Sequence, residues 1–224
     1  MNTKKILQSP IYFKHYKNKP YKLIAEAKHS EDLSDYIVYE CLYPNETAQV
    51  WIRPKKVFNE IGSFNNKQQP RFKACDLRFE FFNEISADIE TAIFALCEKN
   101  FEKFSAEKFY QRLQHKDQVL LICVFDGDKL IGFKIGYELD ILRYYSWLGA
   151  VDENYRGLGI AKILMHEQHQ WALHKKYKYI ETKSENRFKA MIALNIFSGF
   201  EIVGTETSTR GQIKILFRKK LNNS

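Results

Sequence analysis

The segment from Arg156 to Ala161, with the sequence R-G-L-G-I-A, holds the residues best suited to chemistry in this chain. Its two glycines let the backbone approach a ligand closely, because they have no side chain and tolerate unusual backbone angles. A long amphipathic segment follows, and the first amides of a helix have no partner inside that helix. Those amides and the helix dipole favour an anion, so the segment predicts a diphosphate site. An ordinary glycine-containing turn is the alternative that these residues leave open.

The diphosphate site needs a strand before the glycines and a helix after them. Residues 143–151 are predicted as a strand, and a helix is predicted over 157–177 because apolar residues follow one face. The pattern also predicts strands over 75–82, 119–125, 130–137, 179–183, 201–205 and 213–217 and helices over 87–101, 106–115 and 188–198. Ser86 and Ser105 are predicted N-caps of the first two of these helices.

Residues 1–60 are predicted to form a small antiparallel β-barrel domain. Short segments rich in aromatic and β-branched residues, at 11–16, 21–27, 36–43 and 49–53, are separated by turn-forming residues. The stretch 61–72 is polar and without periodicity, so it predicts a linker to a second domain at 73–224. The aromatic residues of the first part fit a barrel core, or a platform for single-stranded nucleic acid or cationic peptides.

Composition excludes several classes of protein. The 224 residues include 35 basic and 27 acidic ones, a net charge of +8 that permits nucleic acid as a partner but does not demand it. The longest apolar run, Val119–Phe125, is far shorter than the roughly 20 residues of a membrane span. The N-terminus has no secretory signal pattern, so we expect a cytoplasmic protein without membrane contact.

Neither a disulfide framework nor a metal site is predicted. The four cysteines are widely scattered and form no C-x-x-C pair, which favours reduced thiols. His166 and His169 are one helical turn apart, but no third ligand is evident. Together with His174, they are expected to be exposed on the long helix.

Two separated motifs carry a resemblance to a known family. Gly149-Ala150-Val151 followed by the R-G-L-G-I-A segment, and Gly199-Phe200 before an apolar strand, resemble the signatures of the Gcn5-related N-acetyltransferases. The resemblance covers residues 73–222. It implies an α+β acetyltransferase fold with a mixed central sheet flanked by helices, with acetyl-CoA as cofactor. It also implies direct attack by an amine on the thioester in a ternary complex.

The resemblance also implies which residues bind the cofactor. Backbone amides from Gly157 to Lys162 would hold the pyrophosphate, and those of Gly149 to Val151 would pair with the pantetheine arm. One of the strand amides would polarise the thioester carbonyl. Arg156 and Lys162 would add positive charge or be solvated, and Asn186 would cap the last helix or touch the cofactor. The predicted cofactor-binding residues are Gly149, Ala150, Val151, Arg156, Gly157, Leu158, Gly159, Ile160, Ala161, Lys162 and Asn186.

The chain departs from the family at two catalytic positions. Asn195 stands where many members have a tyrosine that protonates the departing thiolate. We expect its side chain to face inward, either at the cofactor sulfur or bonded to backbone. Tyr145 stands where some members have a glutamate base, and an ordinary tyrosine is a poor base at neutral pH. Glu138 and Asp140 are the alternative bases. The predicted catalytic residues are Tyr145, Glu138 and Asn195.

The cluster from Tyr144 to Trp147 is predicted to line part of the acceptor pocket, with core packing as the alternative for every second member. In the first part of the chain, the H-Y-K run at 15–17 and the W-x-R-P run at 51–54 resemble a family of small bacterial domains of unknown function. Its members are expected to be SH3-like barrels. That resemblance covers residues 9–60 and offers no activity.

The sequence therefore predicts an acetyl-CoA-dependent N-acetyltransferase that acts on a primary amine of a small molecule or peptide. The alternative is a non-catalytic acyl-CoA-binding protein whose front domain recruits a protein or nucleic acid. A third reading is a nucleic-acid-binding protein in which the front domain dominates. The sequence does not name the acceptor, and it leaves a homodimer open.

Overall fold

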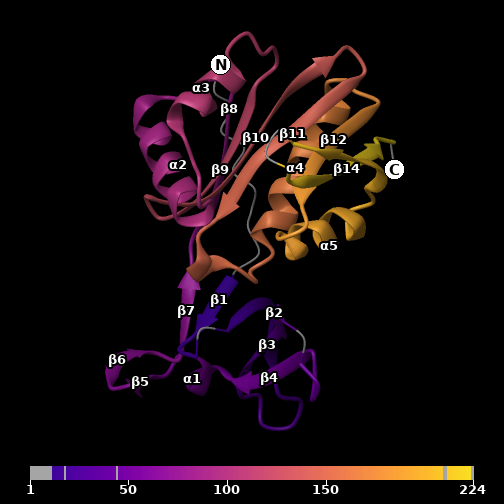
Figure 1. The fold of residues 1–224 in the computed structure, drawn as a ribbon. Helices are drawn as coiled ribbons and strands as arrows, with labels where there is room; N and C mark the ends of the chain where they lie inside the picture. The colour runs from indigo at the N-terminus through magenta and orange to yellow at the C-terminus, as the bar shows by residue number, and fades with distance from the viewer. Residues whose placement is uncertain (1–11, 18, 44, 209–210, 223–224) are drawn as a thin grey trace.

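The computed structural model describes residues 12–17, 19–43, 45–208 and 211–222. Two parts are visible in Figure 1, a small sheet at the bottom and a larger sheet with helices above it. Strands β1 (Tyr12–His15) and β7 (Phe72–Cys75) of the small sheet lie next to the larger part, and β7 points toward it.

The first part is an open sheet. Its strands are β1, β2 (Pro20–Lys28), β3 (Asp35–Cys41), β4 (Val50–Pro54) and β7. They are antiparallel neighbours in the order β4-β3-β2-β1-β7. The predicted barrel is therefore wrong, because the edge strands β4 and β7 do not pair to close it.

A short helix packs against one side of this open sheet. Helix α1 (Lys55–Phe58) follows β4 and buries the ring of Phe58, which stacks on Phe72 at 4.1 Å between centroids. Tyr39 of β3 lies in the same cluster. The aromatic residues of this part therefore form a core that a helix covers on one side of the sheet.

The stretch predicted as a linker contains regular structure. Strands β5 (Ile61–Phe64) and β6 (Lys67–Pro70) form a two-stranded hairpin, and β7 then pairs with β1. Main-chain pairing therefore orders residues that the sequence showed only as polar. The division of the chain into domains at this stretch stays a prediction.

The larger part contains a seven-stranded sheet in the order β13-β14-β12-β11-β10-β9-β8. Its strands are β8 (Leu77–Phe82), β9 (Leu120–Asp126), β10 (Lys129–Asp140), β11 (Arg143–Val151), β12 (Tyr179–Glu185), β13 (Glu201–Thr207) and β14 (Ile213–Lys220). All neighbours are antiparallel except β11 and β12, which run parallel. This confirms an α+β fold with a mixed sheet.

Helices cover both faces of this sheet. They are α2 (Ala87–Asn100), α3 (Ala106–Leu113), α4 (Ile160–His174) and α5 (Lys189–Phe197), with a 3₁₀ turn η1 (Glu153–Tyr155). Because strand side chains alternate between faces, Leu121 and Cys123 pack with α2 and α3, whereas Leu120 and Ile122 pack with α4. Figure 1 shows the two helix pairs on opposite sides of the sheet.

Some sequence-based details were right and others wrong. Ser105 caps α3 by accepting a hydrogen bond from the Lys108 amide, whereas the Ser86 side chain makes no cap bond at α2.

His169 is buried, contrary to the prediction, while His166 and His174 are exposed. All four cysteines are buried free thiols. Among the helices described, none has the length and apolar character to cross a bilayer.

Candidate active site

The central parallel pair of strands separates partway along its length. Strands β11 and β12 pair only from Arg143 to Tyr145, while β12 continues alongside β14. The Thr182 hydroxyl donates to the Ser146 carbonyl at 2.8 Å, just beyond the last paired residue. The register of β11 against β10 skips Trp147, which marks a bulge at this point. A gap in the sheet therefore lies beside residues 147–151.

Two strand amides face this gap. The Asp152 amide donates to the Ile131 carbonyl of β10 at 2.8 Å. Since successive residues of a strand turn their amides to opposite sides, Ala150 faces β10, whereas Gly149 and Val151 face the gap. Of the three strand residues predicted to bind the cofactor, these two can therefore donate to a ligand there.

The glycine segment forms the start of α4, as predicted. Gly157 and Gly159 have φ of +83° and +76°, angles that side chains other than glycine rarely adopt. The first α4 amide with a main-chain partner is Ile163, which donates to Gly159 at 3.0 Å. The six amides from residue 157 to 162 have no partner among the described residues.

These amides fit a diphosphate group. A Cβ on Gly159 would have nothing within 4 Å, so the space beside the helix start is open. The helix dipole adds partial positive charge there. Asp152 shapes the approach, because its carboxylate accepts from the Asn154 amide at 2.9 Å and from Lys129 at 2.8 Å.

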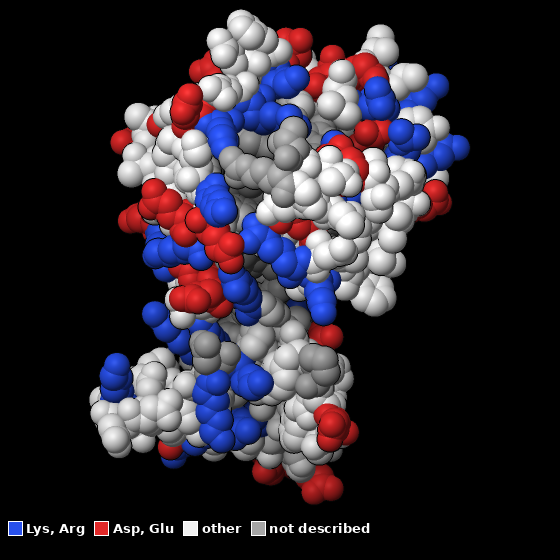
Figure 2. All heavy atoms as spheres, in the orientation of Figure 1, with Lys and Arg blue, Asp and Glu red and all other residues white. Residues whose placement is uncertain are grey.

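The three polar side chains predicted to lie near the cofactor, Arg156, Lys162 and Asn186, are all exposed. Arg156 is exposed and donates to the side-chain oxygen of Asn100 at 2.6 Å, and Lys162 is exposed. Asn186 is exposed, and α5 has Phe188 at its N-cap position, so the capping role of Asn186 is wrong. Lysine and arginine side chains gather along the junction of the two parts of the molecule (Figure 2).

The small sheet supports the loop from a second side. Pro20 of β2 lies so close that a Cβ on Gly157 would be 3.2 Å from its ring carbon. Lys14 of β1 donates to the Asn154 carbonyl and lies 5.4 Å from the centre of the Tyr155 ring. The conformation of the loop therefore depends on contacts from both parts of the chain.

The aromatic cluster of β11 divides between the two faces of the sheet. Tyr144 is fully buried against Trp171 and Tyr177, which is the core-packing alternative. Tyr145 lies on the opposite face beside Tyr137, with ring centres 5.4 Å apart. Of the residues in this aromatic cluster, only those on the same face as Tyr145 can line a pocket near α3.

That second face also holds Trp147 and a basic group. The Trp147 ring packs on Phe109 at 5.3 Å, and the Arg112 guanidinium lies 5.7 Å from the Tyr145 ring centre. Burial raises the pKa of Tyr145 above its usual value, although Arg112 opposes this. Tyr145 therefore stays protonated at neutral pH and cannot serve as a base.

The structure does not bring Glu138 to Tyr145. Tyr177 donates its hydroxyl to the Glu138 carboxylate, and Glu138 lies opposite Tyr144 in the β10–β11 register. Its side chain therefore lies on the face away from Tyr145. Asp140 is bound by Arg143 at 2.7 Å. The two predicted alternative bases are thus held outside the cluster formed by Tyr145 and Trp147.

A different carboxylate interacts electrostatically with this cluster. Glu206 of β13 interacts electrostatically with Tyr145 and with Arg112. A hydrogen bond from Lys183 lowers the pKa of Glu206, so it is ionised at neutral pH. No local pattern identifies Glu206, because only the pairing of β13 with β14 brings it here.

Asn195 faces inward as predicted. Its side chain is 2% exposed, and its Oδ1 has no hydrogen-bond partner within the described chain. The alternative of an asparagine bonded to backbone through this oxygen is therefore wrong. Among the residues described, no cluster of three or more histidine, cysteine or acidic side chains could hold a metal ion.

Comparisons with protein families match both parts of the chain. Residues 84–194 match the acetyltransferase (GNAT) family, and residues 11–74 match a protein of unknown function, DUF1653. None of the curated proteins matches the chain. The family match agrees with the resemblance carried by the two motifs, whereas an SH3-like barrel disagrees with the open sheet.

Solved structures share the fold of the larger part. Ard1 from Thermoplasma volcanium is 14% identical with a TM-score of 0.57, covering 65% of this chain and 99% of its own. The ribosomal-protein-S18-alanine N-acetyltransferase from Escherichia coli is 14% identical with a TM-score of 0.56, covering 65% and 96%. A GNAT family acetyltransferase from Elizabethkingia anophelis with acetyl-CoA bound is 17% identical with a TM-score of 0.51, covering 65% and 99%. At these identities the likeness concerns the fold alone.

Proposed function

We propose that this chain, whose residues 84–194 form an acetyltransferase (GNAT) domain, transfers an acetyl group from acetyl-CoA to a primary amine. Acetyltransferases of this family use acetyl-CoA. The observation that carries the proposal is the row of unpartnered amides from residue 157 to 162, directly beside the gap at β11. An anion site directly beside a free strand edge suits a phosphorylated ligand with a long amide-containing arm.

Within this proposal, the chain binds the diphosphate and the pantetheine arm of the cofactor with main-chain groups. The amides of residues 157–162 hold the diphosphate, and Arg156 and Lys162 add positive charge. Gly149 and Val151 donate toward the arm in the gap. When bound, acetyl-CoA supplies its acetyl group as an activated thioester. A fixed amide of β11 stabilises the negative charge that develops on the carbonyl oxygen.

The acceptor amine would enter on the α3 face of the gap. Tyr145 and Trp147 form an apolar wall there, and Glu206 provides the negative charge. An amine arrives largely as an ammonium ion at neutral pH, which an ionised carboxylate attracts. Glu206 can then accept a proton directly or through water, which makes the amine nucleophilic.

Transfer across a panel of amines tests the proposed function. The panel contains a polyamine, an aminoglycoside, a peptide with a free N-terminus and a lysine peptide blocked at its N-terminus. We expect at least one to cause release of free coenzyme A, with one added acetyl group found by mass spectrometry. The same amine acetylated beforehand is the control and should cause no release.

The rival function predicts a different result in the same assay. Tight acetyl-CoA binding by calorimetry without transfer to any amine would favour a non-catalytic acyl-CoA-binding protein. The specific observation behind this rival is Asn195, because an amide cannot supply the proton that a tyrosine would. Salt-sensitive binding of oligonucleotides would instead support the nucleic-acid alternative.

Glu206→Gln is expected to lower kcat/KM for the acceptor about 100-fold, the usual range for loss of a general base. Acetyl-CoA affinity should not change, because Glu206 lies on the acceptor side. Glu201→Gln is the matched control, since Glu201 is an exposed carboxylate on the same strand. Steady-state kinetics with the best amine of the panel measure both variants. Equal kcat/KM for Glu206→Gln and wild type would remove Glu206 from the acceptor site.

A further inference from the structure

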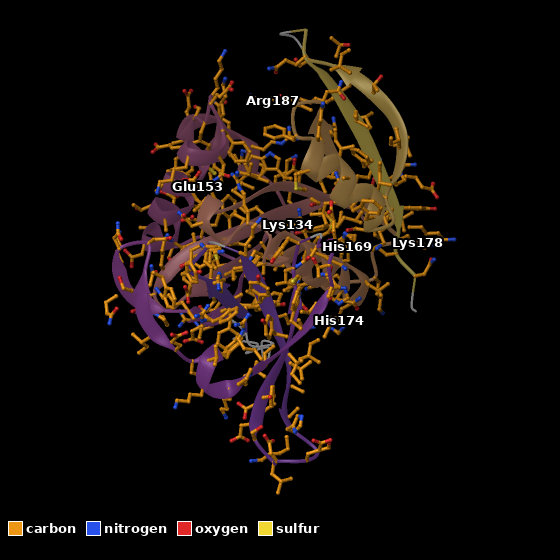
Figure 3. All side chains as sticks on the ribbon, turned by 90° about the horizontal axis from the view of Figure 1, so that it is seen from below. Lys134, Glu153, His169, His174, Lys178 and Arg187 are labelled. Atoms are coloured by element: carbon orange, nitrogen blue, oxygen red, sulfur yellow. The ribbon has the colours of Figure 1, made fainter. Side chains whose placement is uncertain are left out.

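A cluster of buried polar side chains lies on the α4 face of the gap. Four of its members are almost sealed from solvent, since Gln168 is 0%, Asn195 2%, His169 6% and Lys134 8% exposed. They come from β10, α4 and α5, and Lys219 of β14 joins them through His169. Figure 3 shows Lys134 and His169 in the interior of the molecule.

Most polar atoms of this cluster have no partner in the described chain. No hydrogen bond is made by four of these atoms, which are the Oε1 and Nε2 of Gln168, the Oδ1 of Asn195 and the Nε2 of His169. The Lys134 ammonium makes no hydrogen bond or ion pair with a described residue either, although its nitrogen is not among the fully sealed atoms. Unpaired buried groups of this kind cost free energy, and they are typical of sites that bind a ligand.

The histidine of the cluster presents a donor. Its pKa is lowered to about 3 by burial and by Lys219, Lys134 and His166, so the ring is neutral. Lys219 lies 3.3 Å from its Nδ1 and donates at 2.7 Å to the Ser198 carbonyl. Because an ammonium can only donate, Nδ1 accepts from Lys219 and the ring proton is on Nε2.

The cluster has basic groups but no acidic one. The charged groups that act on His169 are Lys219 of β14, Lys134 of β10 and His166 of α4, all of them basic. No charged neighbour acts on Lys134 itself, whose pKa burial alone lowers to about 8. A buried cation without a counter-ion is costly, so the cluster suits a negative charge that a ligand brings or develops.

Lys134 lies next to the strand that borders the gap. Lys134 lies opposite Gly149 in the β10–β11 register, and a Cβ on Gly149 would be 3.6 Å from the Lys134 Cγ. The missing side chain of Gly149 therefore leaves Lys134 beside the strand edge whose amide faces the gap. On the same side of the sheet, Asn195 of α5 stands at the position of the family tyrosine that protonates the thiolate, and its buried oxygen is unpaired.

We propose that the Lys134 ammonium stabilises and protonates the thiolate of coenzyme A as it departs. This inference rests on the proposed acetyl transfer. The amine nitrogen bonds to the acetyl carbon, the carbon–sulfur bond breaks with its electron pair on sulfur, and sulfur takes a proton from Lys134. The ammonium form of the amine loses one proton to Glu206 or water before the attack and a second to water as the amide forms, and Lys134 regains one from solvent.

Titration of the thiol of bound coenzyme A tests this role without turnover. The ultraviolet absorbance of the thiolate, followed against pH in the complex, gives the pKa of the bound thiol. We expect the wild type to lower that pKa by about one to three units, the effect of a nearby opposite charge. Lys134→Met, which removes the charge at similar length, should abolish the shift. Lys134→Arg should keep the shift but slow acetyl transfer, because a guanidinium does not release its proton.

The outcomes separate the two proposals. Calorimetry with coenzyme A comes first, and a wild type that does not bind would overturn both. A wild type that binds with the thiol pKa of free coenzyme A, or a Lys134→Met variant that keeps the full shift, would overturn the role of Lys134 alone. Thermal unfolding of both variants confirms that they are folded. If Lys134→Met unfolds, an unshifted thiol pKa in folded Lys134→Arg overturns the role.

Discussion

Gly159→Glu is expected to abolish the binding of acetyl-CoA, with at least a 100-fold loss of affinity by calorimetry. Three effects act together. The carboxylate would place a negative charge among the amides proposed to hold the diphosphate. The side chain would fill the open space beside the start of α4, where no atom lies within 4 Å of the Cβ position. The backbone angle of +76° would also strain any side chain by about 1 kcal/mol.

Gly127→Glu is the matched control for this variant. Gly127 also has a positive φ, of +60°, and open space at its Cβ position. It lies in the turn between β9 and β10, outside the row of amides at residues 157–162, although the neighbouring Asp126 accepts a hydrogen bond from Tyr155 at 2.7 Å. The same backbone strain and the same added charge should therefore leave acetyl-CoA affinity unchanged. Wild-type affinity in Gly159→Glu would contradict the placement of the diphosphate at this helix start.

The row of free amides at the start of α4 was predictable because its cause is local. Two glycines directly before an amphipathic helix dictate free amides in that place, whatever the rest of the chain does. Strand β11 was predicted with the bounds that the structure shows, 143–151. Position 195 was likewise predicted to face inward from its helical spacing with Phe188, and it does.

The acid and base candidates depend on long-range contacts, and there local reasoning failed. Glu138 is close to Tyr145 in sequence, but the alternation of β10 turns its side chain to the other face, against Tyr177. Glu206 is distant in sequence, yet strand pairing brings it close enough to interact electrostatically with Tyr145. Proximity along the chain is therefore a poor guide to which carboxylate faces a site.

Lys134 escaped notice for a related reason. A lysine between apolar strand residues is ordinarily read as a solvent-facing position, because one face of an antiparallel strand often meets water. Strand β10 is covered by α2 and α3 on one face and by α4 on the other, so neither face meets solvent there. The lysine therefore becomes buried, and only the tertiary structure reveals this.

The part of the chain predicted as a barrel is an open sheet whose core is covered by a short helix. Aromatic and β-branched segments indicate strands but not whether a sheet closes. The residues 55–58 carry too short a pattern to predict a helix, yet Phe58 of this segment covers the sheet core. The small sheet consequently stays open and extends through β7 to the larger part of the chain.

Gly136→Ala is expected to destabilise the protein by about 3 kcal/mol, the upper range for overpacking a tight core. An added Cβ would lie 2.5 Å from a ring carbon of Tyr144, 2.7 Å from the Gln168 side chain and 2.7 Å from the Tyr145 carbonyl. The carbonyl belongs to the neighbouring strand at the bulge and cannot move without breaking the β10–β11 pairing. This crowding explains why β10 carries a glycine where the backbone needs no unusual angle.

Gly132→Ala provides the comparison on the same strand. Its added Cβ would meet Ile160 at 3.3 Å and the Ala150 carbonyl at 3.4 Å, distances that small shifts can relieve. We expect a loss of about 1 kcal/mol or less for this variant, the lower limit for overpacking. Urea unfolding followed by circular dichroism measures both free energies of unfolding. Because both changes add one methyl group to the same face of the same strand, equal stabilities would show that α4 and β11 do not clamp Gly136.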